Sequence, residues 1–216
     1  MKFSAKCREC PRLATFLDEV KAAQPDYFAK PVPSFGDAEA NFLIVGLAPG
    51  MHGANRTGRP FTGDYAGNLL YSTLYEFGFS TSGEPLNADG NANSELALIN
   101  CRITNAVRCL PPQNKPEPSE IKMCNGYLHD ELNLLPQGSA VLALGTIAHQ
   151  AVLRASDLRP KDYSFAHGAA HILPGNIHFY DSYHCSRYNT QTKRLTTPMF
   201  HAVFKSIKEY LGSAQL

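Results

Sequence analysis

The stretch that decides the fold is NFLIVG, residues 41–46, which is followed at once by the glycine-rich loop GLAPGMHGANRTGRPFTGD, residues 46–64. A short, continuous apolar run fits a strand that is buried on both faces of a parallel sheet. The helical pattern AGNLLYSTLYEF comes directly after the loop. Since loops this long inside a compact domain are usually functional or disordered, and this one is bracketed too tightly to be a linker, we expect it to hold something.

The same alternation of apolar run and helical pattern continues along the chain. We predict helices over residues 11–23, 65–77, 117–133, 146–154 and 199–211, and strands over 41–46, 96–100 with its continuation, 139–145 and 178–183. Strands that alternate with helices imply a parallel sheet covered on both faces. In such sheets ligands bind at the carboxyl ends of the strands, where the loops after 41–46 and 178–183 begin. No repeat or boundary divides the chain, so residues 1–216 are predicted to form one domain.

Composition limits the class of partner. The hydrophobic fraction of 44% is typical of a globular protein. The formal net charge is only +1, so the overall charge does not indicate a polyanionic ligand, and nucleic-acid binding would need a local basic patch. The N-terminus MKFSAKCREC lacks the apolar segment of a signal peptide, and runs such as AVLALG are too short to span a bilayer. We therefore expect a soluble intracellular protein with no membrane contact.

The six cysteines suit metal ligands or buried thiols better than disulfides in such a compartment. Cys7 and Cys10 form a C-x2-C pair, and Cys109 and Cys124 flank a proline-rich loop that is too polar to pack itself. Four thiolates can hold zinc or an iron–sulfur cluster, and spacing does not choose between them. Spacing also allows Cys101 in place of Cys109, although we interpret Cys101 and Cys185 as ordinary buried thiols.

The glycine-rich loop matches neither the P-loop nor the dinucleotide-binding template. Its glycines allow close approach of backbone to a ligand. Arg56 and Arg59 could meet phosphates, although exposed arginines are more often simply solvated. Asp64 stands just before the helix, where capping is the usual role of an aspartate. Phe61 is either a core aromatic or a stacking platform.

A second polar loop, YHCSRYNTQTKRL, follows the last predicted strand. Hydrogen-bonding side chains and cations alternate along it, a combination that suits contact with a nucleic-acid backbone. His167 and His171 are four residues apart in HGAAHILPG, a segment that is not expected to form a helix, so we interpret both as structural.

Taken together, these segments resemble the uracil-DNA glycosylase superfamily, and most closely its family 5. The loop of residues 46–64 is similar to that family's first motif and HCSRYNTQTKRL to its second. The four-cysteine pattern is similar to the [4Fe-4S] pattern of families 4 and 5. The resemblance covers residues 7–197. It implies a three-layer α/β/α fold with a central four-stranded parallel sheet, and removal of uracil and other deaminated bases from DNA after the base is flipped into a pocket.

The resemblance also assigns roles to individual residues. It implies that Asp64 handles the attacking water and that His184 donates to the departing base. It implies stacking by Phe61 and reading of the base edge by Asn105, with Gly46 and His52 also at the base. The residues implied to contact DNA are Arg56, Arg59, Ser186, Arg187 and Asn189. The implied cluster ligands are Cys7, Cys10, Cys109 and Cys124, with [4Fe-4S] favoured over zinc.

The chain departs from the family pattern at three positions. Gly50 and Met51 follow GLAP, and Cys185 replaces a proline. Met51 is expected to reshape the pocket, and the polar residue that activates water in other families is Leu47 or Ala48 here, which shifts the burden to Asp64. The alternatives are a family 4 enzyme restricted to uracil, against which Leu47 and NRTG argue, and a non-catalytic, metal-stapled DNA-binding module. We expect a monomer in the cytoplasm, associated with the nucleoid.

Overall fold

The computed structural model describes residues 3–213. One six-stranded sheet runs through it in the order β1-β3-β2-β4-β6-β5. The strands are β1 (Phe35–Gly36), β2 (Phe42–Gly46), β3 (Arg102–Asn105), β4 (Ala140–Leu144), β5 (Ala170–Leu173) and β6 (Ile177–Ser182). β3, β2, β4 and β6 are parallel, and β1 and β5 pair antiparallel at the two edges.

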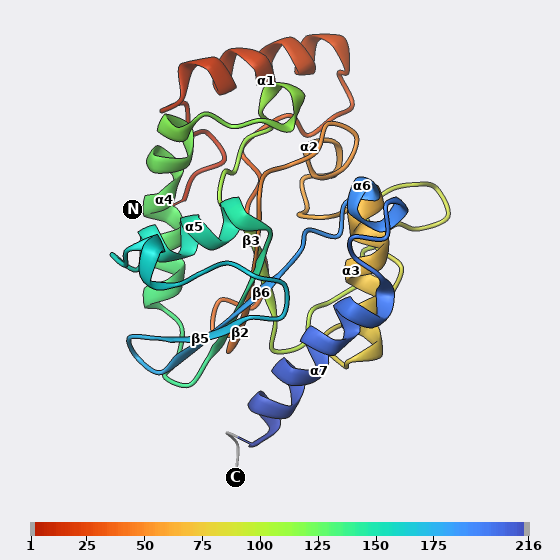
Figure 1. The fold of residues 1–216 in the computed structure, drawn as a ribbon. Helices are drawn as coiled ribbons and strands as arrows, with labels where there is room; N and C mark the ends of the chain where they lie inside the picture. The colour runs from red at the N-terminus through yellow and green to blue at the C-terminus, as the bar shows by residue number, and fades with distance from the viewer. Residues whose placement is uncertain (1–2, 214–216) are drawn as a thin grey trace.

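Helices cover both faces of the sheet, with α4 and α5 on one side and α3 and α7 on the other (Figure 1). The α-helices are α1 (Pro11–Ala23), α2 (Ala54–Thr57), α3 (Tyr65–Glu76), α4 (Pro118–Asn133), α5 (Thr146–Ala155), α6 (Arg187–Gln191) and α7 (Thr197–Ser213). Two short 3-10 turns span Pro112–Asn114 and Pro160–Asp162. The predicted α/β class, with four parallel strands between two helical layers, is confirmed.

The strand sequences explain this layering. Every residue of β2 and β4 is buried, as expected for strands covered on both faces. Successive side chains alternate between the faces: Phe42 and Ile44 pack with α3 and α7, whereas Leu43 and Val45 pack with α4 and α5. A third core joins α1 to α4 around Cys109 and Cys124.

Two expectations about strands were wrong. The second strand is Arg102–Asn105 and does not include residues 96–100, because Ala97 and Ile99 form backbone hydrogen bonds with Thr81 and Phe79. The sheet also has six strands, because short antiparallel edge strands flank the parallel four. β1 has only two residues, and the four residues of β5, Ala-His-Ile-Leu, do not alternate between polar and apolar, so neither carries a clear strand pattern.

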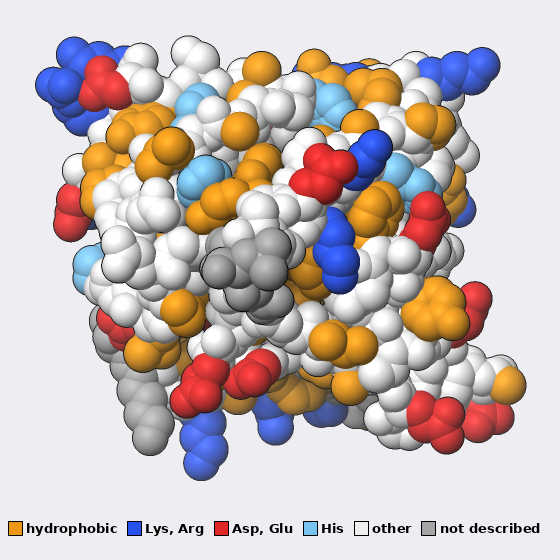
Figure 2. Space-filling view, turned by 90° about the horizontal axis from the view of Figure 1, so that it is seen from below, with side chains coloured by type: hydrophobic (Ala, Val, Ile, Leu, Met, Phe, Trp, Pro, Cys, Tyr) orange, Lys and Arg blue, Asp and Glu red, His pale blue; other side chains and the backbone are white. Residues whose placement is uncertain are grey.

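The surface agrees with the near-neutral composition. The face seen in Figure 2 carries acidic and basic side chains interspersed with hydrophobic ones, with no broad patch of one sign. None of the helices formed by residues 3–213 combines the length and the apolar character that crossing a membrane requires.

Candidate active site

One cavity of about 400 Å³ opens at the carboxyl ends of the parallel strands. It lies where the loop after β2, the end of β3 and the segment after β6 meet, as expected for ligand sites of parallel sheets. Its size is typical of a small-molecule pocket. The residues that line it are Leu47, Ala48, Gly50, Ala54, Phe61, Asp64, Tyr65, Ala66, Asn105, Asn114, His184, Ser186 and Arg187.

Asp64 is both the N-cap of α3 and a wall of the cavity. Its Oδ1 accepts a hydrogen bond of 3.1 Å from the backbone N–H of Gly67, and its backbone is extended as an N-cap requires. Its Oδ2 lies beside Gly50 and Gly53. Burial raises the pKa of Asp64 above its usual value, although the backbone N–H groups of Gly67 and Ala66 oppose the shift. The carboxylate is therefore a stronger proton acceptor than one in water.

Two glycines allow this close packing. A Cβ at Gly46 would lie 2.4 Å from Oδ1 of Asn105 and 2.6 Å from the ring of Phe61, so only glycine lets these two side chains meet there. A Cβ at Gly53 would lie 2.4 Å from Oδ2 of Asp64. Phe61 itself has φ of +54°, a left-handed conformation that is uncommon for a bulky residue and is typical of functional sites.

His184 lies above Phe61, two residues beyond the end of β6. The two rings are stacked, with centroids 5.9 Å apart and planes inclined by 27°. Burial lowers the pKa of His184 to about 4, so the imidazole is neutral at physiological pH. A neutral imidazole can still donate one N–H hydrogen bond to an oxygen that gains negative charge.

Asn105 ends β3 opposite Gly46 of β2. Its side chain is buried at 3% exposure, and its Oδ1 has no hydrogen-bond partner. Such an orphan acceptor is costly unless a ligand satisfies it. Because Asn105 lines the cavity, its amide is available to a polar ligand edge.

The rim of the cavity carries the residues of the second predicted loop. The guanidinium of Arg187 lies over the ring of Tyr65 at 5.1 Å, and Tyr65 is itself exposed. Ser186 caps α6 by accepting from the backbone N–H of Asn189, and the Asn189 amide donates to the carbonyl of His184 at 2.8 Å. Asn189 therefore positions the backbone of His184 and does not line the cavity. Tyr188 is 71% exposed on the same helix.

Four other predicted site residues lie outside the lining, and one of them, Gly46, borders Phe61 and Asn105. His52 is exposed and its Nδ1 hydrogen-bonds to the hydroxyl of Tyr27 at 2.7 Å. Arg56 and Arg59 donate to backbone carbonyls of residues 85–93, so they tie the glycine-rich loop to that segment. Met51, which was expected to reshape the pocket, packs instead against the third core, around Cys109 and Cys124.

The structure adds lining residues that the sequence does not single out. Asn114 reaches the cavity from the proline-rich loop between Cys109 and Cys124, where it and Gln113 both have positive φ. Positive φ at two successive non-glycine residues has no reliable sequence signal. Tyr65 could have been found, because it directly follows Asp64 and begins the predicted helix.

The four predicted metal ligands gather in a second hollow, which Cys7, Cys10, Cys109 and Cys124 line together. All four are free thiols. Burial, and then the charge of Cys124, raise the pKa of Cys10 to about 11, and burial also raises the pKa of Cys109 and Cys124. Without a metal these thiols would stay protonated, whereas the positive charge of a bound metal would favour the deprotonated thiolates. Cys101 and Cys185 are fully buried, as expected.

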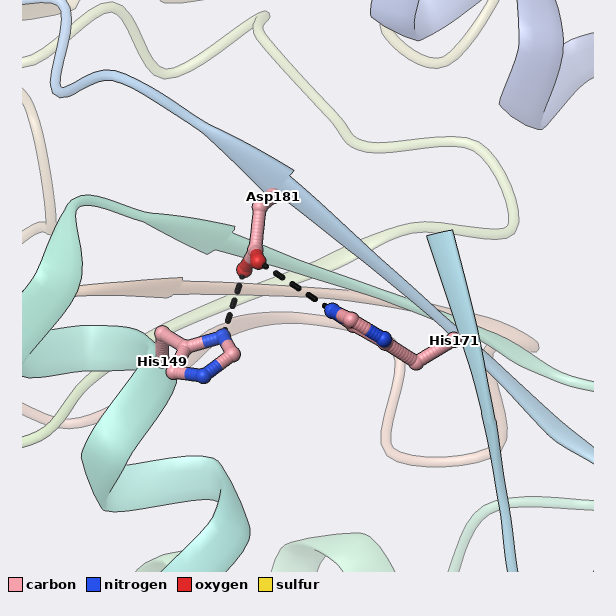
Figure 3. A group of neighbouring side chains, drawn as sticks. All are labelled: His149, His171 and Asp181. Atoms are coloured by element: carbon pink, nitrogen blue, oxygen red, sulfur yellow. Dashed lines mark hydrogen bonds and ion pairs between the residues drawn. The ribbon is translucent and has the colours of Figure 1, made fainter. Parts of the chain in front are cut away.

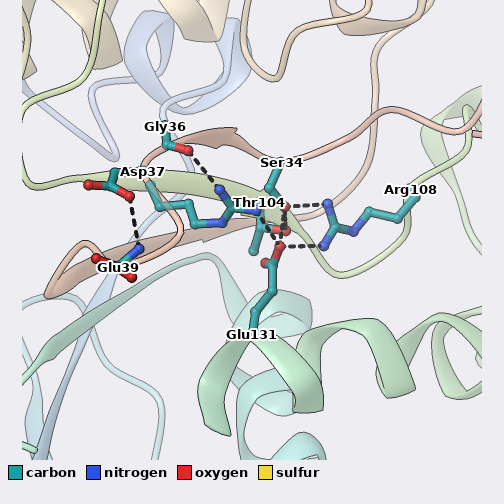
Figure 4. Close-up of polar contacts among 8 residues, drawn as sticks. Ser34, Gly36, Asp37, Glu39, Thr104, Arg108 and Glu131 are labelled. Carbon is teal, nitrogen blue, oxygen red and sulfur yellow. Dashed lines mark hydrogen bonds and ion pairs between the residues drawn. The ribbon is translucent and has the colours of Figure 1, made fainter. Parts of the chain in front are cut away.

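A buried ion-pair network supports the strand that carries Asn105 (Figure 4). Glu131 of α4 pairs with Arg102 and Arg108, each at 3.2 Å, and accepts a short hydrogen bond from Ser34. Burial alone would raise the pKa of Glu131, but Arg108, Ser34 and Arg102 outweigh burial and hold it below its usual value. The network ties Arg102, at the start of β3, and Arg108, three residues beyond its end, to α4, so the chain is anchored on both sides of Asn105.

The arrangement places a proton acceptor, a neutral hydrogen-bond donor, an aromatic face and an unsatisfied amide around one cavity. A planar heterocycle stacked on Phe61 would present its polar edge to Asn105. Such a heterocycle would also have His184 and Asp64 beside it. These are the groups needed to break a bond between a base and a sugar.

Comparison with known proteins agrees with this chemistry. Residues 33–208 match the family model of the uracil DNA glycosylase superfamily. The type-5 uracil-DNA glycosylase of Thermus thermophilus is 47% identical over 95% of this chain and 94% of its own length. The type-5 uracil-DNA glycosylase of Mycobacterium bovis is 39% identical over 95% of this chain and 78% of its own length. A type-4 uracil-DNA glycosylase of Archaeoglobus fulgidus is 31% identical over only 59% of this chain and 54% of its own length.

The type-5 relatives are the more similar to this chain, at 47% and 39% identity over 95% of it, whereas the type-4 relative is 31% identical over 59% of it. This chain therefore belongs to the uracil-DNA glycosylase superfamily, and within it to the type-5 uracil-DNA glycosylases.

Proposed function

We propose that this protein is a DNA-repair glycosylase that hydrolyses the bond between uracil and deoxyribose and leaves an abasic site. The observation that carries this function is the convergence of Asp64, His184, Phe61 and the unpartnered Oδ1 of Asn105 on one cavity. Because a base inside a duplex is inaccessible, the nucleotide is flipped into the cavity before reaction. Hypoxanthine and other deaminated bases are further candidate substrates.

Asp64 acts on the water and the sugar. The bond between the base nitrogen and C1′ of the sugar breaks with its electron pair going to the base. Water then adds to C1′ and loses a proton. The raised pKa of Asp64 suits its carboxylate to accept that proton, and the negative charge of the carboxylate stabilises the oxocarbenium-like sugar. Oδ1 is held by Gly67, so Oδ2, beside Gly50, is the oxygen free for this task.

His184 and Asn105 act on the base. The departing base carries negative charge on its carbonyl oxygen, and the neutral N–H of His184 stabilises that charge without transferring a proton first. Asn105 offers both an acceptor and a donor to the base edge. This pairing compensates the buried Oδ1, which is unsatisfied without a ligand.

The rim is proposed to hold the DNA backbone. Arg187 is exposed beside the cavity and Ser186 lies at the N-terminus of α6, so both can reach a phosphate near the flipped nucleotide. Tyr188, whose ring is largely exposed on α6, offers an aromatic face to the neighbouring bases. Arg56 and Arg59 remain candidates for DNA contact, although carbonyl groups already occupy part of their hydrogen-bonding capacity.

The four clustered cysteines are proposed to hold a [4Fe-4S] cluster. In a zinc site with bonds of about 2.3 Å, neighbouring sulfurs would lie about 3.8 Å apart. No three of these cysteine sulfurs lie within 4.8 Å of one another, a spacing that favours a larger group than one ion. Bound there, a cluster would crosslink the N-terminal segment to the loop that carries Asn114, a structural role.

We also propose that residues 1–216 act as one domain and as a monomer, in the cytoplasm with the nucleoid. A single sheet that spans the described chain supports the first point. The short N-terminal segment is joined to α4 through the cysteine core, so it does not form a separate unit.

The test is excision from a labelled duplex that contains one uracil opposite guanine, with abasic sites revealed by alkaline cleavage. We expect abasic product with the native protein and at least a tenfold lower rate of excision with Asn105→Ala. The control is Asn133→Ala, at the end of α4 and outside the cavity lining, which should keep full activity. Duplex binding without any abasic product would reject the enzyme in favour of a binding module. Parallel duplexes with hypoxanthine or xanthine rank the bases, and excision of uracil alone would favour type-4 behaviour.

A further inference from the structure

A second cluster of ligating side chains lies away from the base pocket, between the helix α5 and the strands β5 and β6 (Figure 3). It consists of His149 from α5, His171 from the edge strand β5 and Asp181 from β6. One donor atom of each side chain lies within 4.8 Å of the other two. The side chains of Asp181 and His149 are 0% and 2% exposed, and that of His171 is 18% exposed, so the group is buried at its centre and reaches the surface through His171.

Hydrogen bonding defines which nitrogen of His149 is available. Its Nε2 lies 3.0 Å from the backbone carbonyl of Tyr163, which can only accept, so Nε2 carries the hydrogen. Its Nδ1 then faces Oδ1 of Asp181 at 2.8 Å. In a neutral imidazole this places two lone pairs against each other, so either a second proton on His149 or a metal ion must lie between them.

The other half of the group has the same need. Nε2 of His171 and Oδ2 of Asp181 are 3.6 Å apart, and neither has a hydrogen-bond partner. A proton shared between His149 and Asp181 would satisfy only the shorter contact and leave these two buried atoms orphaned. No lysine or arginine among residues 3–213 pairs with Asp181.

We propose that His149 Nδ1, His171 Nε2 and Asp181 bind one divalent transition-metal ion, zinc by the chemistry of the donors. Two imidazole nitrogens and a carboxylate are a common zinc donor set. Ligand atoms around tetrahedral zinc, with bonds of about 2.0–2.1 Å, lie about 3.3 Å apart. Here each oxygen of Asp181 faces one histidine, Oδ1 at 2.8 Å from His149 Nδ1 and Oδ2 at 3.6 Å from His171 Nε2, so small side-chain shifts would bring both nitrogens and one oxygen to that spacing. The hydrogen bond from His149 to Tyr163 is the outer contact that metal-bound histidines usually make.

The surroundings indicate a structural ion. The rings of Phe165 and Phe179 pack on His149, and the ring of Tyr163 packs on His171. No fourth His, Cys, Asp or Glu of residues 3–213 joins the group, so water would complete the coordination. The ion would hold α5, β5 and β6 together. Because its ligand Asp181 lies three residues before His184, the ion would also stiffen β6, the strand that leads to the base pocket.

The test uses the purified full chain, with Zn²⁺ and Co²⁺ as probes and iron measured in parallel. We expect one Zn²⁺ or Co²⁺ per chain beyond any metal on the cysteines, and a cobalt spectrum with ligand-field bands but no thiolate charge-transfer band. His171→Gln should bind at least about 100-fold more weakly, because loss of a ligand exceeds the usual cost of losing an outer contact. Its iron content should be unchanged.

The control is His201→Gln, a histidine on α7 that pairs with Glu76 outside this group, and it should keep the site intact. Because a buried variant can lose stability for other reasons, X-ray absorption of zinc in the native protein supplies an independent measure. Nitrogen and oxygen neighbours alone support the site. Sulfur neighbours only, no bound metal beyond the cysteines, or equal affinity in His171→Gln would overturn it.

Discussion

Asp64 accepts a 3.1 Å hydrogen bond from the backbone N–H of Gly67, so one carboxylate caps α3 and lines the base pocket at once. Capping and catalysis therefore do not compete for this residue. The cap holds Oδ1 and orients the carboxylate, while Oδ2 stays beside Gly50 at the cavity. A group fixed in this way reacts without first paying the entropy of being positioned.

Asp64→Asn should separate the two roles. Asparagine caps helices as well as aspartate does, so we expect a melting temperature close to that of the native protein. Loss of the carboxylate should lower the single-turnover rate of uracil excision by about 10²–10⁴, the usual contribution of general base catalysis. Asp64→Ala should lose the rate and, in addition, about 1 kcal/mol of stability with the cap. Near-native turnover in Asp64→Asn would leave capping as the only role.

Gly53→Ala and Gly50→Ala form a matched pair beside the same carboxylate. The new methyl group would stand 2.4 Å from Oδ2 of Asp64 in the first variant and 3.3 Å in the second. We expect Gly53→Ala to displace the carboxylate and to lower excision by about 10², the scale of a misplacement of about 1 Å. Gly50→Ala should stay within a few-fold of native. Equal effects of the two substitutions in single-turnover assays would contradict the assigned position of Oδ2.

The pH dependence of excision should have one acid limb. The folded pKa of Asp64 lies above its usual value, so the reactive carboxylate is lost as the pH falls through that raised pKa. His184, with a pKa of about 4, stays neutral above pH 5 and adds no limb near neutrality. A profile of single-turnover rate against pH checks this. A limb near pH 6.5 that vanishes in His184→Gln would show that the imidazole is charged in the free protein.

Glu131→Gln tests the network that holds β3. The folded pKa of Glu131 is lowered, so its stabilisation is complete above the unfolded pKa and is lost as the pH falls through the folded value. At pH 7 we expect a loss of about 3 kcal/mol, at the lower end for a broken buried pair, since two arginines lose their partner. Thermal melts should show this difference shrinking below pH 4. The exposed pair Lys205–Glu209 offers a control, Glu209→Gln, with no measurable change.

Much of the fold could be predicted from local pattern. The continuous apolar runs of β2 and β4 and the helical periodicity of α3 and α5 are strong signals, because burial on both faces requires apolar residues throughout. The edge strands could not be predicted. β1 is too short to carry a period, and β5 has only four residues, of which the apolar Ile172 is exposed, so its sequence does not show which face is buried.

The candidate site divides in the same way. The resemblance of the two loops to the motifs of the family indicated Phe61, Asp64 and His184 as site residues, whereas residue type alone favoured a helix cap for Asp64. Sequence pattern could not place Asn114, which reaches the cavity through two positive φ angles. Nor could it show that Arg56 and Arg59 bind the carbonyls of residues 85–93, because that contact joins segments about 30 residues apart.

By itself the sequence determined the α/β layering, the cysteine framework and the resemblance to type-5 glycosylases, because these depend on residue type and order along the chain. Only the tertiary structure decided which atoms meet. It left Oδ1 of Asn105 without a partner inside the pocket, and it joined His149, His171 and Asp181, which the sequence places up to 32 residues apart. The physical reason is that burial removes water, so the identity of each neighbouring atom then determines charge and hydrogen bonding.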